Sequence, residues 1–246
     1  DALEPAALET LWRLREEAGA DSAGCAHFNV SAAGEKRVEP LLPAGVYEES
    51  GIRENILWPL TGDRLRLPVF NGFIWRYLFD AAILRDNAIA FEGAYLEDEL
   101  FLMEYFSNAH RLAVTETPLY CYQENPASAT HRYMQDYRSV FVRFLERKTD
   151  IVEKYGLSAA RPHWRDDTVW AGLLIAVGNE YARSNPKSPR EKQQAVEAIC
   201  ALPEFSRAIR QLRPRGLGRN KQIAADLIGS GRFGTLTALY RLKNRM

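Results

Sequence analysis

The chain has 246 residues, of which 46% are hydrophobic and 11% aromatic, enough apolar material for one large domain or two small ones. Its 32 Lys and Arg balance its 32 Asp and Glu, but ten of these bases and one of these acids lie between Arg207 and Met246. No apolar run reaches the roughly 18 residues that span a bilayer, and the three scattered cysteines show neither a disulfide framework nor a metal spacing, which fits a reducing, cytoplasmic compartment.

The first 60 residues alternate between helices, strands and loops. The segment "DALEPAALETLWRLREEAG" predicts a helix that ends at Gly19, a residue suited to a C-cap. Residues 20–30 predict a buried strand followed by a turn at 31–36. We expect a loop punctuated by Pro and Gly at 37–47, and a short helix at 48–60 that ends near Pro59.

The next segments continue this mixed pattern. Residues 70–84 predict a helix that is apolar nearly all round, and residues 87–93 a short strand. A helix follows from Glu97 to Ala109. Residues 111–123 predict two strand segments broken at Pro118, which must lie at an edge because proline cannot donate to a ladder.

From Tyr133 onward the pattern favours helices alone. Apolar residues recur at helical intervals in 133–156, 165–184 and 188–203, the last with Ser188 as N-cap and Pro189 at the first helical position. The basic tail predicts two more helices. The sequence therefore predicts an α/β domain at 1–130 and an all-α domain at 131–246.

Three consecutive acids, Glu97, Asp98 and Glu99, interrupt the aromatic stretch "FEGAYLEDELFLMEYF". Acids are costly to bury unless they are paired or take part in chemistry. In the first turn of a helix, each is stabilised by ~0.3 to 1 kcal/mol through the macrodipole. A helix start is the better interpretation for Glu97 and Glu99.

Five blocks carry a resemblance to a known family. In chain order they are "DALEPAALETL", "GADSAGCAHF", "FNGFIWRYLF", "FEGAYLEDELF" and "PLYCYQENPASAT". Their order and spacing resemble the C-terminal half of a family 2 glycosyltransferase with the GT-A fold. The resemblance implies that 1–130 form the C-terminal half of a GT-A mixed sheet flanked by helices, and 131–246 an all-α extension. It also implies a nucleotide-binding half upstream of Asp1, without which we expect these 246 residues to show no transfer.

The resemblance implies an inverting hexosyltransferase that moves a sugar from a nucleotide-diphosphate-sugar donor to an acceptor hydroxyl. The acceptor would be a glycan or a lipid-linked glycan, in the synthesis of cell-surface or capsular polysaccharide. Asp98 would be the general base, and Glu97 would help to restore a basicity that the helix N-terminus lowers. A divalent metal, Mn or Mg, would screen the diphosphate, with Asp1 and His131 among its ligands.

Each further candidate has a plainer alternative. Asp1 is either a metal ligand or a solvated residue, and His131 either a ligand or a capping residue. Trp75 either stacks on an acceptor sugar or belongs to the core, and Arg76 either meets an acceptor anion or is solvated. Ser128 and Thr130 either line the diphosphate end of the cleft or form a polar loop.

The basic tail places apolar residues at helical intervals among Lys and Arg: Ile223, Leu227, Leu236, Leu239 and Leu242. Such a helix either makes a peripheral contact with the inner face of an anionic membrane or packs on the body of the protein. A nucleic-acid-binding module is a rival hypothesis, but no matching motif appears, so we expect no nucleic-acid partner. A helical scaffold that carries a degenerate transferase remnant is the other.

Overall fold

The computed structural model describes residues 1–62, 72–93, 96–124, 133–212, 214 and 217–243. The chain divides into two compact units. The first, the sheet unit, comprises Asp1–Leu60, Asn71–Pro126 and Asp150–Leu157. The second, the helical unit, comprises Thr61–Phe70, Ala127–Thr149 and Ser158–Met246. The domain boundary that we expected at residue 130 stays a prediction.

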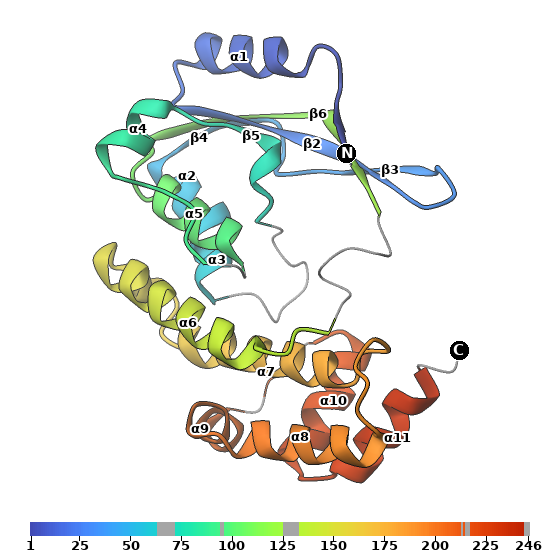
Figure 1. Cartoon of the computed structure of the whole chain (residues 1–246). Helices are drawn as coiled ribbons and strands as arrows, with labels where there is room; N and C mark the ends of the chain where they lie inside the picture. The colour runs from blue at the N-terminus through green and yellow to red at the C-terminus, as the bar shows by residue number, and fades with distance from the viewer. Residues whose placement is uncertain (63–71, 94–95, 125–132, 213, 215–216, 244–246) are drawn as a thin grey trace. The chain divides into compact units, whose positions relative to one another are not determined.

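Two long parallel strands, β2 (Ser22–Val30) and β6 (Arg111–Gln123), form the centre of the sheet. Four short strands pair antiparallel with them: β1 (Ala2–Leu3) and β4 (Gly45–Glu48) with β6, and β3 (Lys36–Glu39) and β5 (Tyr77–Leu78) with β2. Figure 1 shows α1 (Ala7–Ala18) over one face of the sheet and α2 (Glu49–Ile52) and α5 (Glu97–Phe106) on the other. Because both faces are covered, β2 is a nearly continuous buried run.

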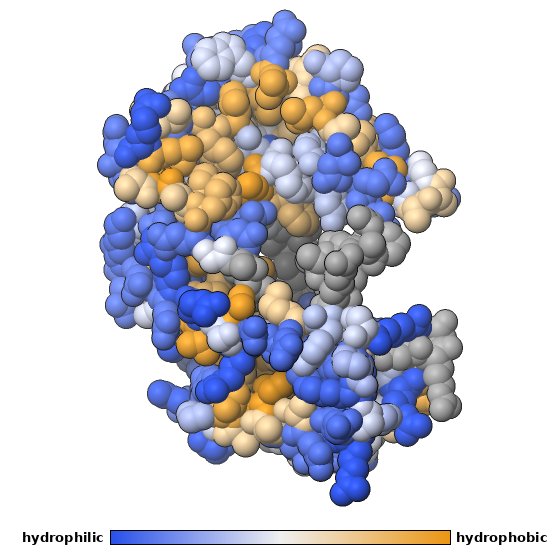
Figure 2. Space-filling view, viewed as in Figure 1, coloured by the Kyte–Doolittle hydropathy of each residue, from blue (hydrophilic) through white to orange (hydrophobic). Residues whose placement is uncertain are grey.

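A small apolar core joins α1 to the sheet. Leu11 is 4% exposed and packs with Ala23 and Cys25 of β2 and Leu119 of β6. The helix ends as expected at Gly19, whose φ of +55° lies in the left-handed region. The outer face of α1 remains apolar in part, since Leu8 is 62% and Trp12 56% exposed. Figure 2 shows further hydrophobic patches on the visible face of the sheet unit.

Several sequence-based expectations for the sheet unit are wrong. The loop expected at 37–47 contains β3 and β4. Both strands are short and have no buried side chain, so no alternation of buried apolar residues marks them in the sequence. The helix expected at 48–60 does not end near Pro59. A π-helical turn (Arg53–Leu57) shifts the hydrogen-bond register, and α3 (Trp58–Gly62) continues past the proline.

The prediction of a single helix at 70–84 is also wrong for the described part of this segment. It consists of a 3₁₀ turn (Ile74–Arg76), strand β5, and α4 (Ala81–Asp86). The Asp80 carboxylate accepts a hydrogen bond from the N–H of Ala82 at 2.7 Å and so starts a new helix. No strand forms in the described residues 87–93. Pro118 does not break β6, because it lies opposite Ala26 at a register shift between β6 and β2.

Among the residues that the structure describes after 133, all regular elements are helices, as the sequence predicts. They are α6 (Tyr137–Lys154), α7 (Trp164–Glu180), α8 (Pro189–Ala201), α9 (Pro203–Gln211), α10 (Arg219–Gly229) and α11 (Phe233–Lys243), with a 3₁₀ turn at Leu157–Ala160. The buried Trp170 of α7 donates to the carbonyls of Ala208 and Leu212 and so fastens α9. Across the described residues, none of the helices is long and apolar enough to cross a membrane. The expected fold class, an α/β sheet flanked by helices and then helices alone, is confirmed.

Candidate active site

Asp98 lies in the first turn of α5, directly after a left-handed residue. Leu96, the N-cap, has φ +55° and ψ 26°, an unusual conformation for a residue with a side chain. Its carbonyl accepts hydrogen bonds from the N–H groups of Glu99 and Leu100 at 3.0 and 3.3 Å. The sharp turn at Leu96 therefore starts α5 at Glu97 and places Asp98 in its first turn.

The electrostatic surroundings of Asp98 favour a basic carboxylate. Burial raises the pKa of Asp98 above its usual range, and the neighbouring charge of Glu97 raises it further. A hydrogen bond from the backbone N–H of Ile74 opposes both effects. Partial burial and the nearby Glu97 therefore both raise the basicity of the Asp98 carboxylate.

Ile74 joins Asp98 to a group of partly exposed aromatic rings, which we call the aromatic ledge. The ledge consists of Phe73, Trp75, Tyr120 and Tyr122. The Trp75 ring is stacked on Tyr120 with centroids 4.1 Å apart and on Phe73 at 5.0 Å. Tyr120 and Tyr122 alternate along β6 with Leu119, which packs toward α1, so the ledge lies on the opposite sheet face.

His27 supports the ledge from inside the sheet. It is 2% exposed, and its ring lies edge-on to Trp75 with centroids 4.7 Å apart. Its Nδ1 atom has no hydrogen-bond partner among the described residues. Burial, followed by the charge of Arg76, lowers the pKa of His27 to about 4, so the imidazole is neutral near pH 7.

Arg76 is not the solvated residue that one interpretation expected. It is 2% exposed, and its Nε donates to the carbonyl of Cys25 at 3.2 Å. Its terminal NH2 donates to the carbonyl of Glu39 at 3.4 Å. The register shift between Cys25 and Ala26 interrupts the hydrogen-bond ladder between β2 and β6. The Arg76 guanidinium donates a hydrogen bond to the Cys25 carbonyl at this interruption. Trp75, rather than Arg76, is therefore the exposed candidate for contact with an acceptor.

Asp1 also contacts the aromatic ledge, through the hydroxyl of Tyr120. Its Oδ2 accepts a hydrogen bond from the Tyr120 hydroxyl at 3.1 Å, and its Oδ1 accepts one from the N–H of Gln123 at 2.9 Å. Contacts thus connect Asp98, through Ile74, Trp75 and Tyr120, to Asp1 within the sheet unit. His131, Ser128 and Thr130 lie outside the described residues.

The metal site expected from the resemblance is not assembled by the described part of the chain. Within it, no three His, Cys, Asp or Glu side chains gather as they do around a metal ion. Asp1 offers one carboxylate, and both of its oxygens already accept hydrogen bonds. One carboxylate falls short of the several oxygen ligands that Mn or Mg requires.

Sequence reasoning missed Phe73, Tyr120, Tyr122 and His27. One signal was present, since Tyr120 and Tyr122 are two residues apart in a strand and so must share a face. No sequence signal indicated that His27 would pack against the ledge. This packing depends on the parallel pairing that sets His27 opposite Tyr120 beyond the register shift.

Comparisons with known proteins show which proteins this chain is similar to. No family model matches this chain. It is 24% identical over 217 residues to the uncharacterized glycosyltransferase EpsJ of Bacillus subtilis strain 168, over 85% of this chain and 60% of EpsJ. The crystal structure of S. aureus TarS 1–349 in complex with UDP-GlcNAc is 13% identical, with a TM-score of 0.51, over 99% of this chain and 65% of TarS.

The chain has a fold similar to that of a glycosyltransferase, and it spans 60% of EpsJ and 65% of the TarS chain. Neither comparison favours the rival hypotheses of a helical scaffold or a nucleic-acid-binding module.

Proposed function

We propose that this chain carries the acceptor side and the catalytic base of an inverting hexosyltransferase of family 2 with a GT-A fold. The observation that carries the proposal is the half-buried Asp98 carboxylate, whose pKa is raised and which is hydrogen-bonded to Ile74 beside the aromatic ledge. The similarity of the chain to EpsJ and of its fold to TarS supports sugar transfer as the reaction class.

Asp98 would take the proton from the acceptor hydroxyl. As the acceptor oxygen bonds to the anomeric carbon, the nucleoside diphosphate leaves from the opposite face with the bonding electron pair, which inverts that carbon. A raised pKa makes the carboxylate a stronger base, and the Glu97 charge favours its protonated product. The Ile74 N–H restrains the carboxylate and so holds it toward one acceptor position.

The aromatic ledge would hold the acceptor sugar. Trp75 and Tyr122 are stacked with an interplanar angle of 5°, and both remain partly exposed. Flat aromatic faces pack against the C–H groups of a sugar ring while its hydroxyls stay hydrogen-bonded. Because Trp75 follows Ile74 directly, a sugar on this ring would present a hydroxyl near Asp98.

The remaining parts of the proposal concern the donor, the metal and the cellular role. A nucleotide-sugar is the proposed donor, the class of ligand named for the TarS structure. A divalent metal, Mn or Mg, with Asp1 and His131 as ligands stays a prediction, and proton transfer to Asp98 does not involve it. We extend the proposal to a glycan or lipid-linked acceptor in capsular or cell-surface polysaccharide synthesis, on the cytoplasmic side with a peripheral membrane contact.

A product analysis tests the reaction class. The full-length protein is mixed with UDP-, GDP- and dTDP-hexoses, a divalent metal and an acceptor glycan, and release of nucleoside diphosphate is measured. We expect one donor to be consumed, and the new linkage, determined by NMR, to have the opposite anomeric configuration to that donor. Retention of configuration, or no consumption of any donor, would contradict the proposal.

A further inference from the structure

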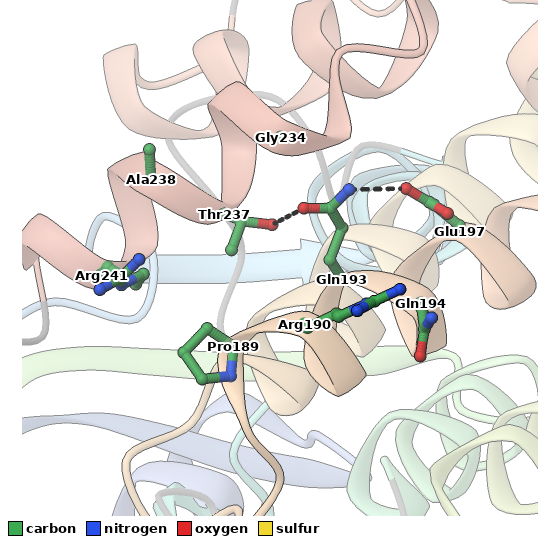
Figure 3. Close-up of a pocket in the computed structure, with 9 residues that line it drawn as sticks. All are labelled: Pro189, Arg190, Gln193, Gln194, Glu197, Gly234, Thr237, Ala238 and Arg241. Carbon is green, nitrogen blue, oxygen red and sulfur yellow. Dashed lines mark hydrogen bonds between the residues drawn. The ribbon is translucent and has the colours of Figure 1, made fainter.

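The helical unit contains a polar groove, far in sequence from Asp98. It has a volume of about 460 Å³ and lies between α8 and α11. Figure 3 shows that side chains from both helices line it. Those that can bind a polar ligand are Arg190, Gln193, Gln194 and Glu197 of α8 and Thr237 and Arg241 of α11.

A hydrogen bond between α8 and α11 lies at one wall of this groove. The Thr237 hydroxyl, 7% exposed, lies 3.3 Å from Oε1 of Gln193 and 2.6 Å from the buried Tyr181 hydroxyl. Gln193 in turn donates from Nε2 to Oε1 of Glu197 at 2.9 Å. These contacts restrain the Gln193 amide before any ligand arrives, which lowers the entropy lost on binding.

The charges at the groove favour an anion. Arg190 and Arg241 come from different helices, and both are exposed. In the part of the chain that the structure describes, neither guanidinium has an ion-pair partner. Glu197 is the single acid among the lining residues, so two positive charges face one negative charge. A guanidinium binds phosphate or carboxylate through paired N–H groups.

We propose that this groove binds an anionic saccharide, a sugar that carries a phosphate or a carboxylate. Arg190 and Arg241 would hold the anionic group. Gln193, Gln194 and Glu197 supply the amide and carboxylate groups that hydrogen-bond sugar hydroxyls. The groove volume falls within the ~300 to 1,000 Å³ typical of small-molecule sites.

Ligand-observed NMR on the full chain, with no donor present, tests the proposal. The probes are glucose 6-phosphate, glucuronic acid, glucose and inorganic phosphate. We expect glucose 6-phosphate to bind with a Kd of about 1 mM, more tightly than either glucose or inorganic phosphate alone. The reason is that only this probe engages both the arginines and the side chains that bind hydroxyls.

Two sets of variants distinguish binding in the groove from non-specific attraction to the positive charge of the chain. Arg190→Gln with Arg241→Gln should weaken glucose 6-phosphate binding at least about tenfold, since each removes a charged hydrogen-bond donor. The control pair, Arg183→Gln with Arg219→Gln, changes the net charge equally at exposed positions outside the groove and should leave binding unchanged. Gln194→Ala should weaken binding of glucose 6-phosphate but not of inorganic phosphate.

A lipid headgroup is the other source of a phosphate, and vesicles distinguish it. We expect vesicles of phosphatidylglycerol and phosphatidylcholine to bind the Arg190→Gln, Arg241→Gln variant as well as they bind the unmodified chain. The proposal is overturned if no saccharide probe binds, if the control pair loses affinity equally, or if only vesicle binding depends on these arginines. Because no transfer is measured, each result stands apart from the role of Asp98.

Discussion

The Asp98 carboxylate accepts a hydrogen bond from the backbone N–H of Ile74, the residue that precedes Trp75. This contact joins the first turn of α5 to the 3₁₀ turn that carries the aromatic ledge, although the two residues are far apart in the sequence. The carboxylate is thereby held at the backbone position next to the partly exposed Trp75 ring. The first three predictions depend on this arrangement.

Replacing Asp98 with Asn should abolish transfer while leaving the fold intact. The change keeps the shape and removes the basicity, and loss of a positioned base costs ~10² to 10⁴-fold in rate. The folded-state pKa of Asp98 is raised, so ionisation of Asp98 destabilises the folded state as pH rises through that pKa. Asp98→Asn should therefore unfold at the same or a higher temperature. Transfer within a few-fold of the unmodified rate would remove Asp98 as the base.

Glu97→Gln should move the acidic limb of the pH–rate profile. The base must be ionised, so kcat/KM rises with pH through the pKa of Asp98. The Glu97 charge raises that pKa, and its removal lowers it, so half-maximal activity should occur at a lower pH. The control is Glu9→Gln, an exposed acid on α1 across the sheet, which should leave the limb in place. An unmoved limb in Glu97→Gln would show that another group titrates.

Trp75→Leu should raise the KM for the acceptor by about 3- to 10-fold, the worth of one stacked aromatic contact. The KM for the nucleotide-sugar should stay unchanged, because the proposed role of Trp75 is confined to the acceptor. Trp75→Phe should give a smaller effect, since a flat ring remains. Trp12→Leu provides the control, because Trp12 is 56% exposed on α1 and lies outside the ledge. Equal changes in both KM values would indicate a general loss of packing.

His27 should make the fold sensitive to acid. Its folded-state pKa is lowered from 6.5 to about 4, so the unfolded chain binds the proton first as pH falls. The stabilisation by neutral His27 is present above pH 6.5 and is lost progressively between pH 6.5 and 4, by up to ~3 kcal/mol. Urea unfolding of His27→Phe should show less loss of stability over this range than the unmodified chain. Parallel losses would contradict the assignment.

Elements that depend on interactions between residues close in sequence could be predicted, and elements that depend on strand pairing could not. The helix at 7–18 was predictable from its apolar periodicity and its C-cap glycine, and the helix at 97–106 from the three acids of its first turn, because these signals act within a few residues. Strands β3 and β4 were not, because both are short and have no buried side chain to mark them, although β3 forms a hairpin with β2 directly before it. The apolar run at 72–84 predicted a single helix that is apolar nearly all round. In the structure, Tyr77 and Leu78 instead pair with β2 as a strand.

The candidate site divides in the same way. Asp98 and Trp75 could be named from the sequence because both lie in blocks that resemble those of family 2 glycosyltransferases. The burial of Arg76, by contrast, follows from carbonyls at a register shift between β2 and β6. That shift depends on how β2 aligns with β6, a strand almost 90 residues away, and the sequence pattern within either strand does not predict this alignment.

The packing of α6 against α7 gives a last prediction, in the helical unit. A Cβ added at Gly172 would lie 2.1 Å from Cε2 of Phe141, and Phe141 is 1% exposed. The Tyr137 hydroxyl also donates to the Gly172 carbonyl at 3.0 Å, so the two helices cannot separate without losing a buried hydrogen bond. Gly172→Ala should therefore lower the free energy of unfolding by about 1 to 3 kcal/mol through overpacking.

Gly178→Ala is the matched control on the same helix. A Cβ there meets nothing within 4 Å, and alanine is a better helix former than glycine by up to ~1 kcal/mol. Urea unfolding should thus show opposite signs for the two Gly→Ala changes in α7. If Gly172→Ala were as stable as Gly178→Ala, then Phe141 would have room to move, and α6 and α7 would not be packed as closely as the structure has them.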